Sequence, residues 1–364
     1  MRLVEVKPVD RNILQQARKK MDNKTKPLGS LGMLEEIACR VAAIQKTLTP
    51  FVREVVVVVF AGDHGIVEEG VSLYPQEVTG QMVANFLRGG AAVNVFAREV
   101  GAKLLVADMG VKGELPSHPA LINCKVRSGS RNFLREQALT REEVETAVRK
   151  GIEIASEYGK DADVLIAGEM GIGNTSSATL LLSGVCGIPV KVLVGRGTGL
   201  DDTMLRHKAK VLSQSFHRRR FDRHDPFSLL EAFGGLEIAG MVGFYLGAAA
   251  LGKVFVVDGF IATAAYAIAK EIEPLVKEYA FLAHLSAEQG HRRVVEKLGL
   301  FPILQLGMRL GEGTGAVLTV PLLRAAVRAL SEMASFDDAA VSRAKKNIKI
   351  FQKTLDFFGK YAII

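Results

Sequence analysis

The chain has 364 residues, enough for about two domains at roughly 150 residues each, and its 48% apolar and 24% charged content excludes a disordered protein. Its three widely spaced cysteines exclude a disulfide framework and a CxxC metal site, and they favour a reducing, cytoplasmic setting. The net charge of +8 favours an anionic partner, either a nucleic acid or a small substrate, and the 36 glycines favour tight turns or close backbone approaches to a ligand.

Two segments could be mistaken for membrane or nucleic-acid elements. The uncharged stretch from Met170 to Val190 is long enough to span a bilayer, but its many polar residues predict buried protein interior instead, and the N-terminus has no apolar signal-peptide core. The densest basic run, from His217 to Arg220, lacks interleaved aromatic residues and is typical of a solvated helix end or loop. We therefore expect neither a membrane anchor nor a nucleic-acid partner.

The predicted elements begin with two helical stretches in residues 8 to 48, around a turn at Lys26 to Ser30. Seven short runs rich in Val, Ile and Leu follow, separated by segments of helix length: Val55 to Phe60, Lys103 to Ala107, Val164 to Ala167, Val190 to Val194, Val254 to Val257, Ala280 to Leu285 and Ile303 to Leu306. Continuous apolar runs that alternate with helices predict buried strands of a parallel sheet. From Pro321 onward the pattern is helical again, with an apolar stripe at Ile348, Phe351, Leu355 and Phe358.

This order predicts an α/β protein with two domains. Residues 50–310 form a doubly wound, Rossmann-like parallel sheet domain that binds substrate. Residues 1–49 and 311–364, from both chain termini, form a smaller helical domain, in which residues 342–364 are a C-terminal helical extension.

Polar, glycine-rich tails follow these runs. Because parallel strands end at one edge of a sheet, the tails are expected to meet there, where ligands of open α/β folds bind. The tail Gly171-Ile172-Gly173-Asn174-Thr175 precedes a predicted helix with Asn174 or Thr175 as N-cap, so it either binds a phosphate or serves only as a packed turn. It matches neither common nucleotide fingerprint.

Five further residues carry possible chemistry. Glu312 lies between glycines in LGEGTG, where it is either a general base with a raised pKa or an ordinary surface glutamate. Glu169 is also flanked by glycines, in Gly168-Glu169-Met170-Gly171, and is expected at the same edge of the sheet. Asp63-His64 has no second histidine at ligand spacing, which favours a structural histidine hydrogen-bonded to backbone over a metal ligand. Lys208 is an ordinary helix lysine unless an anionic substrate lies beside it.

Several long motifs resemble one known family. AGDHGIVEEGVSLYPQEVTGQMVANFLRGGAAVNVFARE (61–99), GEMGIGNTSSAT (168–179), VGRGTGLDD (194–202), HLSAEQGHR (284–292) and LGMRLGEGTGA (306–316), together with KPLGSLGMLEEIA (26–38), are similar to nicotinate-nucleotide:dimethylbenzimidazole phosphoribosyltransferases. The resemblance runs from about residue 10 to about residue 341, and five long motifs in order make it specific.

The resemblance implies transfer of the phosphoribosyl group of nicotinate mononucleotide to 5,6-dimethylbenzimidazole, in assembly of the lower ligand of cobalamin. The products are α-ribazole 5′-phosphate and nicotinate. The resemblance also implies a homodimer without a cofactor. No metal is implied, because the pyridinium leaving group is already activated. Glu312 falls at the catalytic base. The resemblance also assigns substrate-binding positions, which are Glu169, Gly171, Gly173, Asn174, Thr175, Lys208, Ser286, Gly311, Gly313, Gln76, Met82, Met170 and Leu310.

Within that assignment the phosphate lies on the loop from Gly171 to Thr175, Lys208 and Ser286 lie near the nucleotide, and Gln76, Met82, Met170 and Leu310 line the slot for the flat base. The segment around Gln76 and Ala84 varies in the family, which leaves benzimidazole, adenine and phenolic compounds open as acceptors. Two alternatives belong to other functional classes, a non-catalytic nucleotide sensor and a basic nucleic-acid-binding protein. An intact Glu312 argues against the sensor. The glycine-rich motifs argue against the nucleic-acid-binding protein, because they would have no function in it.

Overall fold

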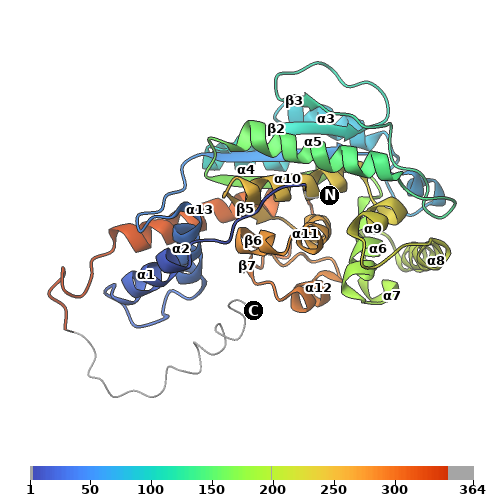
Figure 1. Ribbon diagram of the computed structural model, residues 1–364. Helices are drawn as coiled ribbons and strands as arrows, with labels where there is room; N and C mark the ends of the chain where they lie inside the picture. The colour runs from blue at the N-terminus through green and yellow to red at the C-terminus, as the bar shows by residue number, and fades with distance from the viewer. Residues whose placement is uncertain (1–2, 198, 343–364) are drawn as a thin grey trace. The chain divides into compact units, whose positions relative to one another are not determined.

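Seven parallel strands form the central sheet, in a computed structural model that describes residues 3–197 and 199–342 (Figure 1). Their order is β3-β2-β1-β4-β5-β6-β7. Their bounds are β1 Val55–Gly62, β2 Lys103–Gly110, β3 Leu121–Asn123, β4 Val164–Met170, β5 Val254–Val257, β6 Ala280–His284 and β7 Pro302–Leu304. The order reverses between β1 and β4, so the carboxyl ends of these two central strands flank a crevice suited to a ligand.

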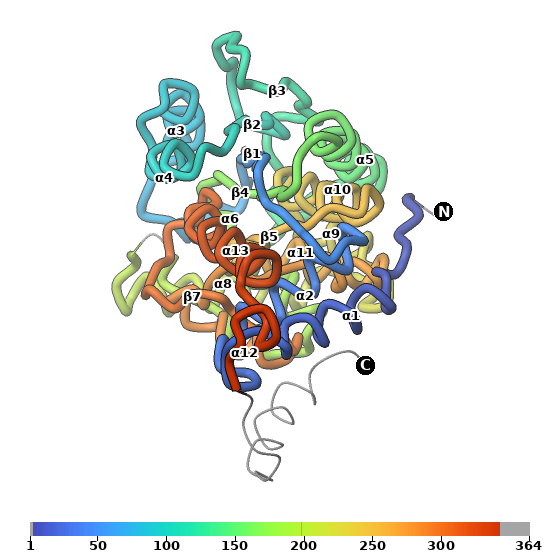
Figure 2. Tube along the Cα trace, turned by 90° about the vertical axis from the view of Figure 1, so that its left-hand side faces the viewer, coloured from blue at the N-terminus to red at the C-terminus, as the bar shows by residue number. Residues whose placement is uncertain are grey.

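The middle strands are buried on both faces, which explains their continuous apolar sequences. All eight residues of β1 are buried, and its register sets Val57 beside Leu104 of β2 and Ile166 of β4. Helices α3 (Val78–Leu87) and α4 (Ala92–Val100) lie on one side of β1 and β2, and α5 (Arg141–Gly159) and α10 (Leu236–Ala250) lie on the other (Figure 2). Six of the seven predicted strands are confirmed.

The predicted strand at residues 190–194 is wrong: Val190–Leu193 is a short helix, α7. Val190, Leu193 and Val194 are buried while Lys191 and Val192 are exposed, which is the spacing of a helix face and not of a covered strand. Pro189 precedes the run and its fixed φ suits a helix start. The strand that sequence reasoning missed, β3, is a three-residue edge strand without an apolar run.

The other helices of the described residues are α1 Arg11–Asp22, α2 Met33–Gln45, α6 Asn174–Cys186, α8 Asp202–Arg218, α9 Pro226–Phe233, α11 Phe260–Ile272, α12 His291–Leu298 and α13 Thr314–Glu332, with 3₁₀ turns at Gly65–Glu69 and Pro274–Glu278. The uncharged stretch from residue 170 to 190 is mostly interior, as expected, because α6 is almost entirely buried. Within the described residues α13 alone is long and apolar enough to cross a bilayer, and 56% of that window is buried, as in a core helix.

The described chain divides into two compact units. The larger consists of residues 3–7 and 54–319 and contains the sheet; the smaller consists of residues 8–53 and 320–342. The expected boundary near 310 differs from this division, in which the loop around Glu312 and the first turn of α13 belong to the larger unit. Of the expected extension 342–364, all but the first residue lies outside the described residues.

In the smaller unit, α1 packs on α2, and the side chain of Asp10 caps α1 by accepting the Ile13 N–H at 2.9 Å. Segments from the two ends of the chain meet here. The Lys24 ammonium donates to the carbonyl of Met333, and the Arg324 guanidinium donates to the carbonyl of Val52 at 3.2 Å. These contacts join residues about 300 positions apart in the sequence into one helical body.

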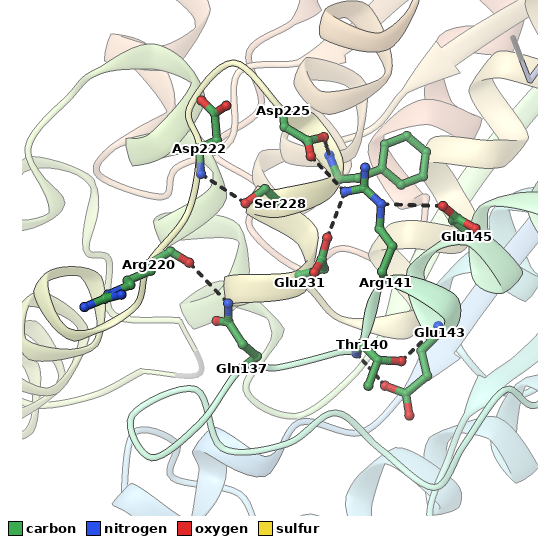
Figure 3. A network of polar contacts seen from close by, with 11 residues as sticks. Gln137, Thr140, Arg141, Glu143, Glu145, Arg220, Asp222, Asp225, Ser228 and Glu231 are labelled. Atoms are coloured by element: carbon green, nitrogen blue, oxygen red, sulfur yellow. Dashed lines mark hydrogen bonds and ion pairs between the residues drawn. The ribbon is translucent and has the colours of Figure 1, made fainter. Parts of the chain in front are cut away.

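A polar network fixes the start of α5 against α9 in the larger unit (Figure 3). Thr140 and Glu143 form a capping box, and the Arg141 guanidinium lies 2.8 Å from both Asp225 and Glu231. The Arg141 side chain also covers the ring of Phe227 at 4.9 Å. Behind this network α5 and α10 approach closely: a Cβ on Gly151 would lie 2.0 Å from the Gly240 carbonyl oxygen, so only glycine fits there.

Candidate active site

A cavity of about 480 Å³ lies in the larger unit and is lined by residues that follow β4, β5 and β6 and by the loop before α13. Most of the predicted site residues line it together: Met82, Glu169, Met170, Gly171, Gly173, Asn174, Thr175, Lys208, Ser286, Leu310, Gly311 and Glu312. Gln76 and Gly313 are outside its lining. The carboxyl edge of the sheet therefore gathers the glycine-rich tails as the sequence predicts.

Glu312 is buried, with 5% of its surface exposed, which rules out the surface-glutamate alternative. Its φ of 63° lies in the left-handed region that is costly for a residue with a Cβ, and Gly311 and Gly313 on either side have φ values of 87° and 86°. Burial raises the pKa of the Glu312 carboxyl to about 6, against a hydrogen bond from the Val93 backbone that lowers it. Its Oε2 atom is buried without a hydrogen-bond partner.

The tail of β4 lies directly against the Glu312 loop. A Cβ on Gly168 would lie 2.1 Å from the Glu312 carbonyl oxygen, and a Cβ on Gly311 would lie 2.1 Å from Oε1 of Glu169. The position of Gly168 requires glycine because the near atom is backbone, and that of Gly311 favours glycine because its φ of 87° lies in the left-handed region. The two acidic residues are therefore held on touching backbone segments.

Glu169 is also buried, and its pKa is raised well above its ordinary value. Burial is the main cause, and the neighbouring carboxyl groups of Asp258, Glu237 and Glu312 add to it. The Asn174 amide donates a hydrogen bond to Oε2 of Glu169 and opposes the shift. The site thus favours a protonated Glu169 beside the more readily ionised Glu312.

The loop after β4 leads into α6, but its capping differs from the expectation. Gly173, with φ of 96°, is the N-cap, and no side chain caps the helix. Asn174 bonds to Glu169 instead, and the hydroxyl of Thr175 accepts the Lys208 ammonium at 2.8 Å. The predicted N-cap role of Asn174 or Thr175 is therefore wrong, because both side chains turn to partners that also line the cavity.

Lys208 is not an exposed helix lysine. Only 1% of its surface is exposed, and burial lowers the pKa of its ammonium group to about 8, against an opposing effect of Glu288. The buried Lys208 ammonium lies at the N-terminus of α6, so it adds positive charge where the helix N-terminus already favours an anion. The arrangement is suited to a phosphate group.

Sequence reasoning missed several lining residues, among them Asp258, His284, Glu288 and Arg309. Asp258 directly follows β5 and His284 ends β6, so the signal that singled out the other tails also marks these two. The Asp258 carboxylate accepts the Ala316 N–H at 2.8 Å and the backbone N–H groups of Gly313 and Gly315. It thereby anchors the Glu312 loop and the start of α13 to the sheet.

The remaining predicted residues lie beside the cavity. Gln76 donates to the His64 carbonyl at 3.0 Å and accepts from the Lys112 ammonium at 2.8 Å. His64 is fully buried and its Nε2 lies 2.7 Å from Oε1 of Glu237, so its partner is a carboxylate and not the expected backbone. Within residues 3–197 and 199–342, no group of three His, Cys, Asp or Glu side chains is arranged to hold a metal ion.

Comparison with known proteins assigns the chain to a family. A family model described as "Phosphoribosyltransferase" matches residues 6–341. The nicotinate-nucleotide–dimethylbenzimidazole phosphoribosyltransferase of Geobacter sp. (strain M21) is 50% identical over 93% of this chain and 98% of its own length, and that of Desulforamulus reducens is 48% identical over 94% and 98%. A crystal structure of the Thermus thermophilus enzyme, 46% identical, superposes with a TM-score of 0.87 over 92% of this chain and 100% of its own. The chain belongs to the nicotinate-nucleotide–dimethylbenzimidazole phosphoribosyltransferase family.

Proposed function

We propose that the cavity transfers the phosphoribosyl group of nicotinate mononucleotide to 5,6-dimethylbenzimidazole, with Glu312 as the general base. The observation that carries the proposal is a buried, unpartnered carboxylate oxygen on a strained loop, in a family named for this reaction. The products are α-ribazole 5′-phosphate and nicotinate.

The protonation state of Glu312 suits this task. With a pKa of about 6, the carboxyl is about nine-tenths ionised at pH 7, and its unpartnered Oε2 is free to accept a proton. Taking the N–H proton of the benzimidazole leaves the electron pair of the other ring nitrogen to form the new bond to C1′. The proton passes to Glu312 and then to water.

Bond breaking needs no acid. The bond from C1′ to the nicotinate nitrogen breaks with its electron pair going to nitrogen, which converts a pyridinium cation into neutral pyridine nitrogen. Attack from the face opposite the departing ring changes the β-riboside into an α-riboside. The protein's contribution is therefore to hold the two rings on opposite sides of C1′ and to remove one proton.

The ends of the cavity suit the two substrates. The phosphate is assigned to the loop Gly171 to Thr175 and to Lys208, where the start of α6 and a buried ammonium group combine. The flat base is assigned to the walls formed by Met82, Met170 and Leu310, which line the same cavity. Gln76 lies outside the lining, so any effect it has on the base passes through its bonds to His64 and Lys112.

The finer description of the molecule is part of the same proposal. We infer a doubly wound domain that binds both substrates, a helical domain made by both chain termini, a homodimeric assembly and a cytoplasmic location. The strand order supports the first inference, the composition of the smaller unit the second, and the three buried free cysteines the cytoplasmic location; the homodimer is implied by the family resemblance alone.

Acceptor competition tests the substrate assignment. Purified protein is incubated with nicotinate mononucleotide and equimolar 5,6-dimethylbenzimidazole, benzimidazole, adenine and a phenol, and the ribosides are separated and quantified. We expect dimethylbenzimidazole to give the largest kcat/KM. Preference for another acceptor would mean that the protein catalyses the same reaction with a different acceptor base. If no acceptor leads to release of nicotinate, the alternative of a non-catalytic nucleotide sensor would be favoured.

A further inference from the structure

His291 is a buried histidine beside the cavity that the proposed reaction does not use. It begins α12, none of its surface is exposed, and it is absent from the cavity lining. Both ring nitrogens have partners: the Ser286 backbone N–H lies 2.9 Å from Nδ1, and the Thr263 hydroxyl oxygen lies 3.0 Å from Nε2. The ring thus connects the segment after β6 with the first turn of α11.

The directions of these hydrogen bonds follow from the donors available. Ser286 can only donate its N–H, so Nδ1 must be an unprotonated acceptor, and Nε2 must carry the proton and donate it to Thr263. The Thr263 hydroxyl then donates its own hydrogen to the Gly259 carbonyl at 2.7 Å. One chain of hydrogen bonds therefore runs from Ser286 through His291 and Thr263 to Gly259. Within it, each group can act as donor and acceptor in only one way.

The chain of bonds requires a neutral ring, and the surroundings supply one. Burial lowers the pKa of His291 to about 3, and the nearby His284 acts in the same direction. The ring of Phe260 packs edge-on against it with centroids 6.1 Å apart. The imidazole consequently keeps the same tautomer across the physiological pH range.

The two ends of this chain are parts of the cavity wall. Ser286 follows β6, Gly259 follows β5, and both line the cavity. Gly259 is also the N-cap of α11, and its carbonyl accepts the Thr263 N–H at 2.8 Å. The spacing of the two strand tails is thus fixed through a side chain that lies outside the cavity lining.

We propose that His291 is a positioning residue, which uses its Nε2–H tautomer to hold Ser286 against the phosphoribosyl group of the nucleotide. The inference rests on the proposed function for the identity of that ligand. It predicts a specific kinetic defect: loss of the bond to Ser286 weakens nucleotide binding and leaves the acceptor side and the proton transfer of Glu312 unchanged.

Two substitutions separate the two ring nitrogens. In His291→Asn the amide oxygen takes the place of Nδ1 and can still accept from Ser286, whereas in His291→Gln the amide nitrogen takes the place of Nε2 and that acceptor is lost. We expect His291→Gln to raise KM for nicotinate mononucleotide about tenfold, the scale of one buried hydrogen bond. We expect the KM of His291→Asn for nicotinate mononucleotide to stay within about threefold of the wild-type value. In both variants kcat and the KM for 5,6-dimethylbenzimidazole should be nearly unchanged.

A threonine pair supplies the matched control. Thr263→Val removes the acceptor of Nε2–H, while Thr319→Val removes a buried hydroxyl of the same kind whose bond, to the Ala316 carbonyl at 2.7 Å, stays within α13. Both are nearly isosteric and both should lower the melting temperature. Only Thr263→Val should also raise KM for nicotinate mononucleotide, because it leaves the Nε2–H of His291 buried without an acceptor and so displaces the ring from Ser286, whereas His291→Asn carries no Nε2–H group.

A readout independent of activity is the ¹⁵N chemical shifts of the His291 ring in the wild-type protein. A neutral Nε2–H ring that does not titrate down to about pH 4 supports the inference. A ring that titrates above pH 5, a wild-type KM in His291→Gln, or equal rises of both KM values in step with lost stability would overturn it. If His291→Gln fails to fold, the ring shifts and the threonine pair decide. Failure of the proposed function would show separately, as wild-type protein that releases no nicotinate.

Discussion

At the scale of single residues, the environment of Glu312 decides its chemistry. From the sequence, a glutamate in a glycine-rich loop is either a general base or an ordinary surface residue, and the burial of Glu312 excludes the second interpretation. Its ionised form is available at neutral pH because the shift of its pKa to about 6 is moderate, whereas Glu169, at the other side of the same contact, is pushed toward the protonated form. The two carboxyl groups are about equally buried, and their surroundings separate them: the neighbouring carboxyl groups of Asp258 and Glu237 raise the pKa of Glu169 further, while a backbone hydrogen bond from Val93 limits the rise at Glu312.

Replacing Glu312 tests its proposed role as general base directly. We expect Glu312→Gln to lower kcat by about a hundredfold or more, the usual range for a lost general base, because the amide cannot accept the benzimidazole proton. KM for nicotinate mononucleotide should change little. Steady-state kinetics with a circular dichroism control for folding measures this, and near-wild-type turnover would contradict the assignment.

The pKa of Glu312 also predicts the pH dependence of catalysis. The proposed mechanism requires the ionised carboxylate, so kcat/KM should fall about tenfold per pH unit below a midpoint near pH 6. This acidic limb should be absent from the residual activity of Glu312→Gln. A wild-type profile that is flat between pH 5 and pH 8 would show that another group accepts the proton.

The same shift predicts an effect on stability with the opposite sign from a salt-bridged acid. The pKa of Glu312 is higher in the folded protein, so folding favours the protonated form; its stabilising effect is full below about pH 4.5 and is lost as the pH rises through about 6. Glu312→Gln should therefore melt at a higher temperature than wild type at pH 7 to 8, with the gap closing below pH 4.5. Calorimetry across this range gives the comparison, and a lower melting temperature for the variant at pH 8 would contradict it.

At the scale of elements, the sequence is informative where a pattern is repeated and silent where a contact is long-range. The buried runs of Val55–Gly62 and Val164–Met170 are covered strands as predicted, and the residues after Val164–Met170 line the cavity. Val190–Leu193 has a similar composition, but only the exposure of Lys191 and Val192 shows that it is a helix. The bonds of Asn174 to Glu169 and of Lys208 to Thr175 depend on how separate elements pack, so the sequence alone does not show them.

The contact between the β4 tail and the Glu312 loop can be tested without touching an acidic residue. Gly168→Ala places a methyl group 2.1 Å from the Glu312 carbonyl, so the loop must move. We expect turnover to fall at least about tenfold, because shifts of about 1 Å at a reacting group are costly. The control is Gly80→Ala in the first turn of α3, where the nearest atom is 3.8 Å away; it should keep full activity and gain at most about 0.5–1 kcal/mol. Equal activity of the two variants would mean that the contact does not position Glu312.

The network at the start of α5 is expected to affect stability alone. Arg141→Met keeps the apolar stem over Phe227 but removes the ion pairs to Asp225 and Glu231, which should cost about 1 kcal/mol at low salt and less at high salt. Arg328→Met, which removes one exposed pair with Glu332, should cost less than half of that. Urea unfolding at two salt concentrations measures both, and a loss of turnover in Arg141→Met would place the network in the active site's support.

At the scale of the whole molecule, the family match ends at residue 341, so we expect residues 342–364 to be dispensable for catalysis. A chain shortened to residues 1–341 should keep kcat and KM within about twofold of the full-length protein. We expect any cost to fall on the melting temperature or on dimer formation, which light scattering on both forms measures. Lost turnover with an unchanged melting temperature and assembly would show that residues 342–364 take part in the chemistry.

The stereochemistry of the product tests the central claim most directly. Wild-type protein is incubated with nicotinate mononucleotide and 5,6-dimethylbenzimidazole, and proton NMR follows the anomeric signal of the new riboside together with free nicotinate. We predict α-ribazole 5′-phosphate and nicotinate in equal amounts, because attack opposite the departing ring inverts C1′. A β-riboside, or nicotinate released without a new riboside, would contradict transfer by direct displacement in this cavity.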